Sequence, residues 1–193
     1  MLSKTFITAL GFAVTALAAP HHARDNTTAS GLYFQPSAWY NYHVNSGAID
    51  CNVQGGIVDK SYNNQGKDIT TLATFTYPPA TAGQRCQLAF YLDNTAPVTG
   101  SGKIDVFTRN QPAPGCTTGW GPGNQRGNNI GRWSVAKNAF ATWDATFGAY
   151  LTAPTACKPV GTQEGFEFVG VYDNDHVAWN PAANAGARIY YFP

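Results

Sequence analysis

The sequence carries little charge. Charged residues make up 12% of the chain, about half the share usual in globular proteins. The 12 basic and 11 acidic residues nearly cancel, which leaves a net charge of +1. Without a basic surface the chain has no electrostatic basis for binding nucleic acid or an anionic membrane. We therefore expect neither as a partner.

Beyond its first 19 residues the chain also lacks any apolar run near the roughly 20 residues that a membrane helix needs. The first residues instead resemble an export signal, with Lys4, an apolar stretch over residues 6–17 and the small-residue cleavage signature Ala16-Leu17-Ala18. We predict a signal peptide at residues 1–18 and a flexible polar lead-in at 19–30. The mature protein is expected to be secreted and extracellular.

No Cys-x-x-Cys pair is present, which argues against a metal or redox role for the cysteines. Cys51, Cys86, Cys116 and Cys157 are an even set, all downstream of the expected signal peptide. In an oxidising compartment such a set predicts two disulfides. Three connectivities are open, and each bridge would stabilise the fold by roughly 3–4 kcal/mol.

The lead-in carries two modification or ligand candidates. Asn26-Thr27-Thr28 is a glycosylation sequon, so Asn26 is a candidate glycan carrier. His21 and His22 could bind copper if cleavage exposed them at the amino terminus, with His176 as a conceivable partner. A frayed polar tail is the simpler interpretation.

Hydrophobic residues after residue 30 alternate with a period of two, and no convincing helical stretch occurs. In Cys86-Gln87-Leu88-Ala89-Phe90-Tyr91-Leu92, for example, every second side chain is apolar and shares one face. The candidate strands are residues 69–77, 86–92, 104–107, 130–135, 141–151, 166–172 and 187–192. About eight short strands separated by Gly, Pro and Asn clusters predict one all-β domain over residues 31–193, an antiparallel, jelly-roll-like β-sandwich.

Aromatic residues are abundant, with 5 Trp, 10 Tyr and 11 Phe. A flat sugar-stacking face is one use for them, and Trp39, Tyr40 and Trp120 are the candidate ligand-binding residues. Trp120 lies in a Gly/Pro/Asn-rich segment at 112–129 that we expect to be an ordered loop anchored through Cys116. Core packing would explain most aromatics in a small sandwich.

Glutamate is scarce: Glu164 and Glu167 are the only two. Paired carboxylates suggest a glycosidase. Residues three apart on a strand face opposite ways, however, so the two would not flank one sugar. We expect exposed turn and strand positions for them.

Asp173-Asn174-Asp175-His176 gathers oxygen ligands at a turn, as calcium sites do. The segment lacks the glycine and distal glutamate of an EF-hand loop, and Asx residues are common in hairpins. Asp173 and Asp175 are therefore weak candidates for metal ligands.

The common catalytic signatures are absent: there is no nucleophile elbow, zinc-binding His-Glu-x-x-His, phosphate loop or dinucleotide fingerprint. We expect no cofactor. Arg126, Arg132 and Asp105 are charged residues within otherwise neutral segments, and we expect them to form structural ion pairs.

Several short motifs, taken in order, resemble the fungal ubiquitin-3-binding protein But C-terminal domain family. The motifs are Phe75-Thr76-Tyr77-Pro78, Cys86-Gln87-Leu88-Ala89-Phe90, Ile104-Asp105-Val106-Phe107, Arg126 with Gly131-Arg132, Cys157-Lys158-Pro159-Val160-Gly161, Phe166-Glu167-Phe168-Val169 and Val177-Ala178-Trp179-Asn180-Pro181 through Ile189-Tyr190-Tyr191. The likeness covers about two thirds of the chain. One departure is Lys158, which separates the cysteine from the proline of the family's Cys-Pro-x-Gly turn.

The resemblance implies a β-sandwich in a secreted fungal protein, with no enzymatic residues to carry over. It also implies the pairings Cys86–Cys157 and Cys51–Cys116. The family's intracellular partner, an activating enzyme of a ubiquitin-like modifier, does not transfer to a chain with an export signal.

We therefore expect a secreted, non-catalytic protein that binds a partner or forms part of an extracellular surface. The alternatives are a carbohydrate-binding module for wall polysaccharide and a glycan-active enzyme. The expected partners are cell-wall polysaccharide or an extracellular protein.

Overall fold

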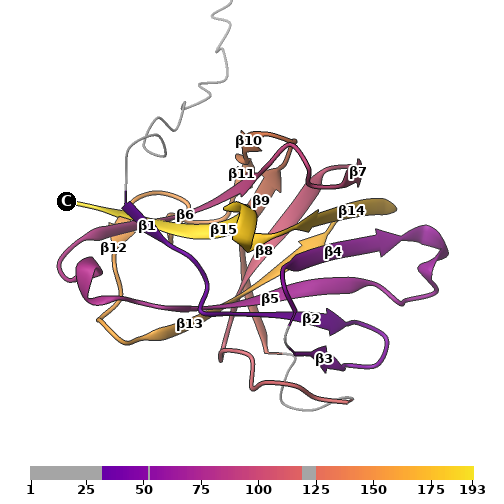
Figure 1. The fold of residues 1–193 in the computed structure, drawn as a ribbon, viewed down its shortest axis with the longest axis horizontal. Coiled ribbons are helices and arrows are strands. Elements are labelled where there is room, and N and C mark those ends of the chain that lie inside the picture. Colours follow the sequence, from indigo (N-terminus) through magenta and orange to yellow (C-terminus); the bar gives the residue numbers. More distant parts are fainter. Residues whose placement is uncertain (1–31, 52, 119–124) are drawn as a thin grey trace, which may run out of the picture.

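The computed structural model describes residues 32–51, 53–118 and 125–193 (Figure 1). These residues contain fifteen β-strands, three short 3-10 turns and no α-helix. All strand pairings are antiparallel, for example β15 (Gly186–Phe192) with β6 (Arg85–Leu92). The predicted all-β antiparallel sandwich is confirmed, although its strands are more numerous than the eight or so expected.

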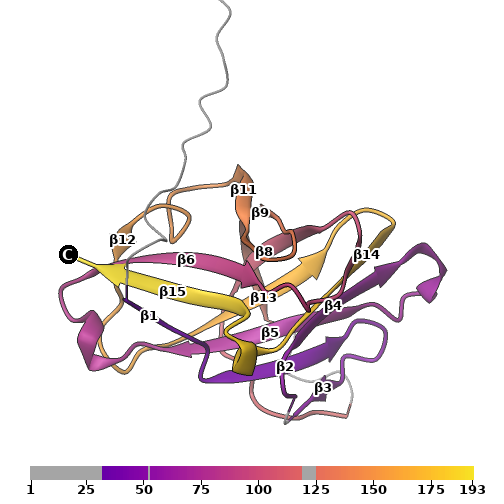
Figure 2. The ribbon, with the colours of Figure 1, turned by 45° about the horizontal axis from the view of Figure 1, so that its top comes forward.

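The smaller sheet has five strands, and β15 lies at its centre. The spatial order is β1 (Leu32–Phe34), β15, β6 and β10 (Ala139–Phe140), with β12 (Thr155–Ala156) also paired to β6. The first and last strands of the described chain are therefore neighbours, because Tyr33 pairs with Tyr190. Figure 2 shows this layer lying over strands of the larger sheet.

The larger sheet has ten strands. In spatial order they are β11 (Thr142–Thr146), β9 (Arg126–Ser134), β8 (Lys103–Arg109), β13 (Gln163–Gly170), β5 (Ile69–Thr76), β4 (Gly56–Ser61), β14 (Asn174–Trp179) and β7 (Val98–Gly100), with β2 (Ala38–His43) paired to β5 and β3 (Ile49–Asp50) paired to β2. Both β2 and β4 pair with β5 at Ile69, through His43 and Asp59 respectively.

The main core fills the space between the two sheets, as alternation predicts. Leu88, Phe90 and Leu92 of β6 face Phe75 of β5 and Phe168 of β13 within one buried cluster. On β8, Asp105 and Phe107 point the other way from Ile104 and Val106, also as expected. The period-two pattern thus identifies the face of each of these strands correctly.

A second, smaller cluster lies on the outer face of the larger sheet. It consists of Tyr42, Ile49 and Leu72, with Ala113 packed against them. Ala113 belongs to the segment after β8, which returns to this face and bonds to β3 through a bridge between Ile49 and Thr117. Part of the expected long loop at 112–129 is therefore an ordered cover over the sheet.

Both disulfides implied by the family resemblance are present. Cys51–Cys116 attaches this covering segment to the end of β3, and Cys86–Cys157 joins β6 to the chain after β12. The four cysteines are all paired. The expectation of two structural disulfides is confirmed.

One candidate strand was wrong. Residues 141–151 were expected to be extended, but β11 ends at Thr146 and a turn follows. A bulge between Trp143 and Ala145 already disturbs the pairing there.

The described part of the chain forms no helix that could span a membrane.

Candidate functional site

Trp179, the last residue of β14, stands at the edge of the main core. Its indole is 4% exposed and packs edge-on against Phe90, with ring centroids 4.9 Å apart. Trp39 of β2 contacts it from another side at 5.8 Å, also edge-on. These aromatic contacts fix the orientation of the indole.

Glycines make the space that Trp179 occupies. A Cβ atom on Gly56 would lie 1.9 Å from indole Cζ2, and one on Gly186 would lie 2.3 Å from Cδ1. A Cβ on Gly55 would lie 2.1 Å from the carbonyl oxygen of Trp179. A side chain at Gly56 or Gly186 would displace the indole, and one at Gly55 would meet the backbone of Trp179, so the local sequence Gly55-Gly56 is required by close packing.

A groove opens beside this tryptophan, between β2 and the start of β4. Its volume is about 480 Å³, within the range of small-ligand sites. Besides Gly55 and Gly56, its lining consists of Asn41, Val53, Gln54, Ile57, Trp179 and Asn180. None of these residues is charged. We call this feature the Trp179 groove.

Two buried polar atoms of the groove-lining residues make no hydrogen bond within the described part of the chain. They are the acceptor Asn41 Oδ1 and the donor Trp179 Nε1. A buried polar atom without a partner costs about 1–3 kcal/mol. The groove thus combines an apolar aromatic wall with hydrogen-bonding capacity that the fold does not use.

The predicted sugar platform is not assembled from Trp39 and Tyr40. These two residues are neighbours on β2 and so face opposite sides of the sheet. Trp39 packs against the main core, whereas Tyr40 packs against the outer cluster of Tyr42, Ile49 and Leu72. Trp120, the third candidate, lies outside the described residues.

Glu164 is buried between the sheets, not exposed in a turn as expected. It lies within β13 and accepts hydrogen bonds from the hydroxyls of Tyr77, at 2.8 Å, and Tyr150. The ammonium of Lys158 is 3.3 Å from its carboxylate. Burial, together with the negative charge of Glu164, raises the pKa of both tyrosines well above the ordinary value.

Glu167 is fully buried on the opposite face of the same strand. It accepts two hydrogen bonds from the guanidinium of Arg126, at 2.6 and 3.0 Å, and one from Thr70 at 2.8 Å. The guanidinium of Arg109 lies 4.0 Å away. The expectation of an exposed position was wrong because the buried Arg109 and the partly exposed Arg126 compensate the charge. The expectation of opposite faces is confirmed.

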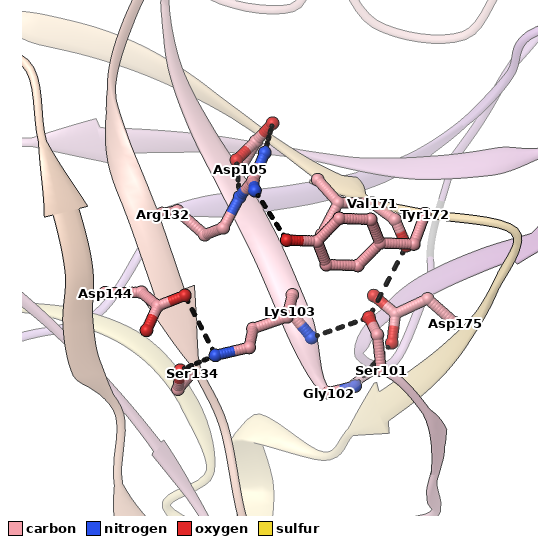
Figure 3. A network of polar contacts seen from close by, with 10 residues as sticks. All are labelled: Ser101, Gly102, Lys103, Asp105, Arg132, Ser134, Asp144, Val171, Tyr172 and Asp175. Atoms are coloured by element: carbon pink, nitrogen blue, oxygen red, sulfur yellow. Dashed lines mark hydrogen bonds and ion pairs between the residues drawn. The ribbon is translucent and has the colours of Figure 1, made fainter.

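The expected ion pairing of Arg126, Arg132 and Asp105 is also observed. Besides the Arg126–Glu167 pair, Arg132 forms two hydrogen bonds with Asp105, at 2.7 and 3.0 Å (Figure 3). Both pairs lie on the outer face of the larger sheet. They hold β9 to β8 and β13.

Asp173 and Asp175 are not arranged as ligands for a metal ion. Asp173 is exposed, whereas Asp175 is buried and accepts the backbone N–H of Gly102 at 2.9 Å. Burial raises the pKa of Asp175 despite this bond. Within the described residues, no group of three or more His, Cys, Asp or Glu side chains could hold a metal.

Two histidines can be placed, and each faces an aspartate. The ring of His43 lies 2.7 Å from Asp50, and that of His176 lies 3.7 Å from Asp59. His21 and His22, like the sequon at Asn26 and the expected signal peptide, fall outside the described residues. The copper and glycosylation hypotheses therefore remain predictions.

Comparison with known proteins identifies no family for this chain. No protein-family model matches the chain, and no curated protein matches it significantly.

Sequence reasoning missed the residues of the Trp179 groove. Asn41, the glycines at 55–56 and Trp179 come from three separate regions and meet only because β4 pairs with β14 while β2 lies alongside. The one local signal was the doublet Gly55-Gly56 at the start of β4. Close backbone approach is one reason for glycine in a strand.

Proposed function

We propose that this protein is a secreted, extracellular binding domain that acts without catalysis. The export signal predicted at residues 1–18 and the two disulfides support an extracellular location. The two glutamates, the carboxylate pair considered for a glycosidase, are instead engaged by tyrosine hydroxyls and arginines in separate networks. Contacts of this kind stabilise the fold.

The Trp179 groove is the observation that carries the proposal of binding. It offers an aromatic wall, amide side chains and the unpaired acceptor Asn41 Oδ1. A ligand that draws the Asn41 amide toward the groove and donates a hydrogen bond to Oδ1 would recover the cost of burying this atom. The rigid aromatic packing around Trp179 means that the groove is already formed before a ligand enters.

A carbohydrate-binding module is the second candidate, and the neutral lining of the groove favours it. Asn41, Gln54 and Asn180 can exchange hydrogen bonds with hydroxyl groups without attracting ions. The C–H groups of a sugar ring could pack against Val53, Ile57 and the small exposed part of Trp179. The proposed ligand of this candidate is an oligosaccharide from wall polysaccharide.

Tryptophan fluorescence and calorimetry test the binding proposal. Wild-type protein and the variant Asn41→Leu are each titrated with oligosaccharides of chitin, β-1,3-glucan and cellulose. We expect Asn41→Leu to weaken binding about tenfold or more, because it removes the acceptor and narrows the groove. Asn94→Leu, at an exposed turn, is the matched control and should bind as wild type does.

Secretion has its own test. Amino-terminal sequencing of protein recovered from culture medium should show a start at Ala19. A product that retains residues 1–18, or that stays inside the cell with free thiols, contradicts the extracellular assignment.

In the binding test, equal affinity of wild type and Asn41→Leu contradicts the role of the groove.

A further inference from the structure

Two strongly exposed tyrosines lie close together at one end of the sandwich. Tyr62 is 80% exposed and follows β4, and Tyr172 is 60% exposed and precedes β14. Because Ser61 of β4 pairs with Asn174 of β14, both tyrosines leave the same end of this strand pair. The Trp179 groove is at the other end, where Trp179 pairs with Gly56.

The two loops are joined by their backbones. The N–H of Tyr62 donates to the carbonyl oxygen of Asp173 at 2.6 Å. Tyr62 also begins a 3-10 turn, which Ser61 caps through its side chain. The tyrosines are therefore presented from fixed loops on a rigid scaffold, an arrangement common in recognition sites.

Tyr172 has an unfavourable backbone conformation. Its φ is +61°, in the left-handed region that bulky residues rarely adopt. Glycine or asparagine would fit this position at lower cost. An exposed aromatic residue here gains no core packing, and its stabilising contact is with the guanidinium of Arg132. Strain of this kind is concentrated at functional positions.

The ring of Tyr172 is held in place from one side. Its hydroxyl accepts a hydrogen bond from the guanidinium of Arg132 at 3.1 Å, and the guanidinium carbon lies 5.3 Å from the ring centroid. Asp105 in turn fixes Arg132 through two hydrogen bonds (Figure 3). The ring is thus oriented before any partner arrives, which lowers the entropic cost of binding.

Neutral and acidic hydrogen-bonding residues follow the two tyrosines in sequence, and the guanidinium of Arg132 contacts the ring of Tyr172. Asp173 and Asn174 follow Tyr172, Asn63 follows Tyr62, and all three are exposed. Aromatic faces next to carboxylate and amide oxygens match a molecule with an apolar face and a hydroxylated edge. A pyranose sugar has this chemistry: its C–H face packs on an aromatic ring, and its hydroxyls bond to Asx side chains.

We propose that Tyr62 and Tyr172 form a stacking site for a sugar residue of an extracellular glycan. We call this end of the molecule, with Asp173 and Asn174, the tyrosine tip. The tip is separate from the Trp179 groove and does not depend on it. Arg132 is a positioning residue, because it acts by orienting Tyr172.

The test is calorimetric titration with hexasaccharides of chitin, β-1,3-glucan, cellulose and β-1,4-mannan. Tyr172→Ala and Tyr62→Ala should each weaken binding of the recognised sugar about tenfold, and Tyr172→Phe much less, since it keeps the ring. Phe147→Ala is the matched control, because Phe147 is 61% exposed on the loop after β11. It should bind as wild type does.

A second variant separates binding from folding. Tyr172→Asn removes the ring but suits a positive φ, so we expect weaker sugar binding with a melting temperature that does not fall. If Tyr172→Asn lowers the melting temperature while binding stays intact, Tyr172 is structural and the proposal is overturned.

Sugar binding by Asn41→Leu distinguishes the proposal for the tyrosine tip from the proposal for the Trp179 groove. A sugar whose binding is lost in Asn41→Leu but unchanged in the tyrosine variants would place recognition in the groove and overturn the tip. Loss in the tyrosine variants alone supports the tip. Failure of all four hexasaccharides to bind wild type overturns the sugar assignment, and a tip that serves only a protein partner would give this result.

Discussion

Glu164 and Glu167 lie three residues apart on β13 and face opposite sides of the larger sheet. Tyr77 and Tyr150 donate to Glu164 on the core side, whereas Arg126 and Thr70 donate to Glu167 on the outer side. The sheet separates the two carboxylates, so they cannot act on one glycosidic bond as an acid and nucleophile pair. Each instead joins segments that are separated in sequence.

Removing the charge of Glu167 should destabilise the fold strongly. In Glu167→Gln the guanidiniums of Arg109 and Arg126 would lose their buried counter-ion, and breaking a buried pair costs about 3–5 kcal/mol. Urea unfolding measures this change. Asp144→Asn is the control, because the Lys103–Asp144 pair is partly exposed and should contribute about 0–1 kcal/mol. Equal effects of both substitutions would contradict the assigned roles.

The tyrosines on Glu164 predict sensitivity to alkali. Burial, then the negative Glu164, raises the pKa of Tyr77 and Tyr150 above the value of about 10 that each has in the unfolded chain. Above pH 10 the unfolded state therefore loses these protons first, and stability falls as pH rises. Below pH 10 both states are protonated and the contribution is complete.

Tyr150→Phe tests this dependence. It removes one of the two ionising groups, so chemical unfolding measured from pH 8 to pH 12 should show a shallower loss of stability above about pH 10 than wild type does. Identical alkaline slopes in the two proteins would show that the buried tyrosines do not govern the transition.

The two disulfides should differ in how fast they are reduced. They span 65 and 71 residues, so on the chain-entropy model each stabilises by about 4 kcal/mol. Cys116 is exposed, whereas Cys86 is fully buried in the core. We expect limited reduction to open Cys51–Cys116 first, as mapped by alkylation and peptide mass analysis. Opening of Cys86–Cys157 first would contradict this order.

Substitution of Gly56 should disrupt the Trp179 groove. In Gly56→Ala the new Cβ would overlap the indole of Trp179, and overpacking of this kind costs about 1–3 kcal/mol. Trp179 fluorescence should shift as the ring moves. Gly66→Ala is the control: no atom lies within 4 Å of its new Cβ, so only its positive φ should cost stability, about 1–2 kcal/mol. An unshifted spectrum in Gly56→Ala would contradict the close approach.

The sequence predicted the strands whose two faces differ. Residues 86–92 alternate clearly, and β6 covers them because one face enters the core. β4 and β14 were missed, because Gly56, Asp59 and His176 interrupt their apolar pattern. The register of these strands depends on long-range pairing with each other, which periodicity does not reveal.

The site was predicted less well than the fold. Trp39 and Tyr40 are adjacent in sequence, and alternation alone places them on opposite faces of β2. The groove and the tyrosine tip both need the pairing of β4 with β14, which brings Gly56 to Trp179 and Ser61 to Asn174. The burial of Glu167 could not be foreseen because its arginine partners are 41 and 58 positions away.

The position of β15 has a consequence for how the protein is made. It is the last strand of the described chain, yet it lies between β1 and β6 and bonds to both. The smaller sheet cannot close until residues 186–192 are available to pair with both β1 and β6, so its formation depends on contacts of long sequence separation. Under the export that we propose, a chain that pairs so late would still be unfolded at a translocation channel, and oxidative cross-linking of Cys86 with Cys157 would follow on the far side.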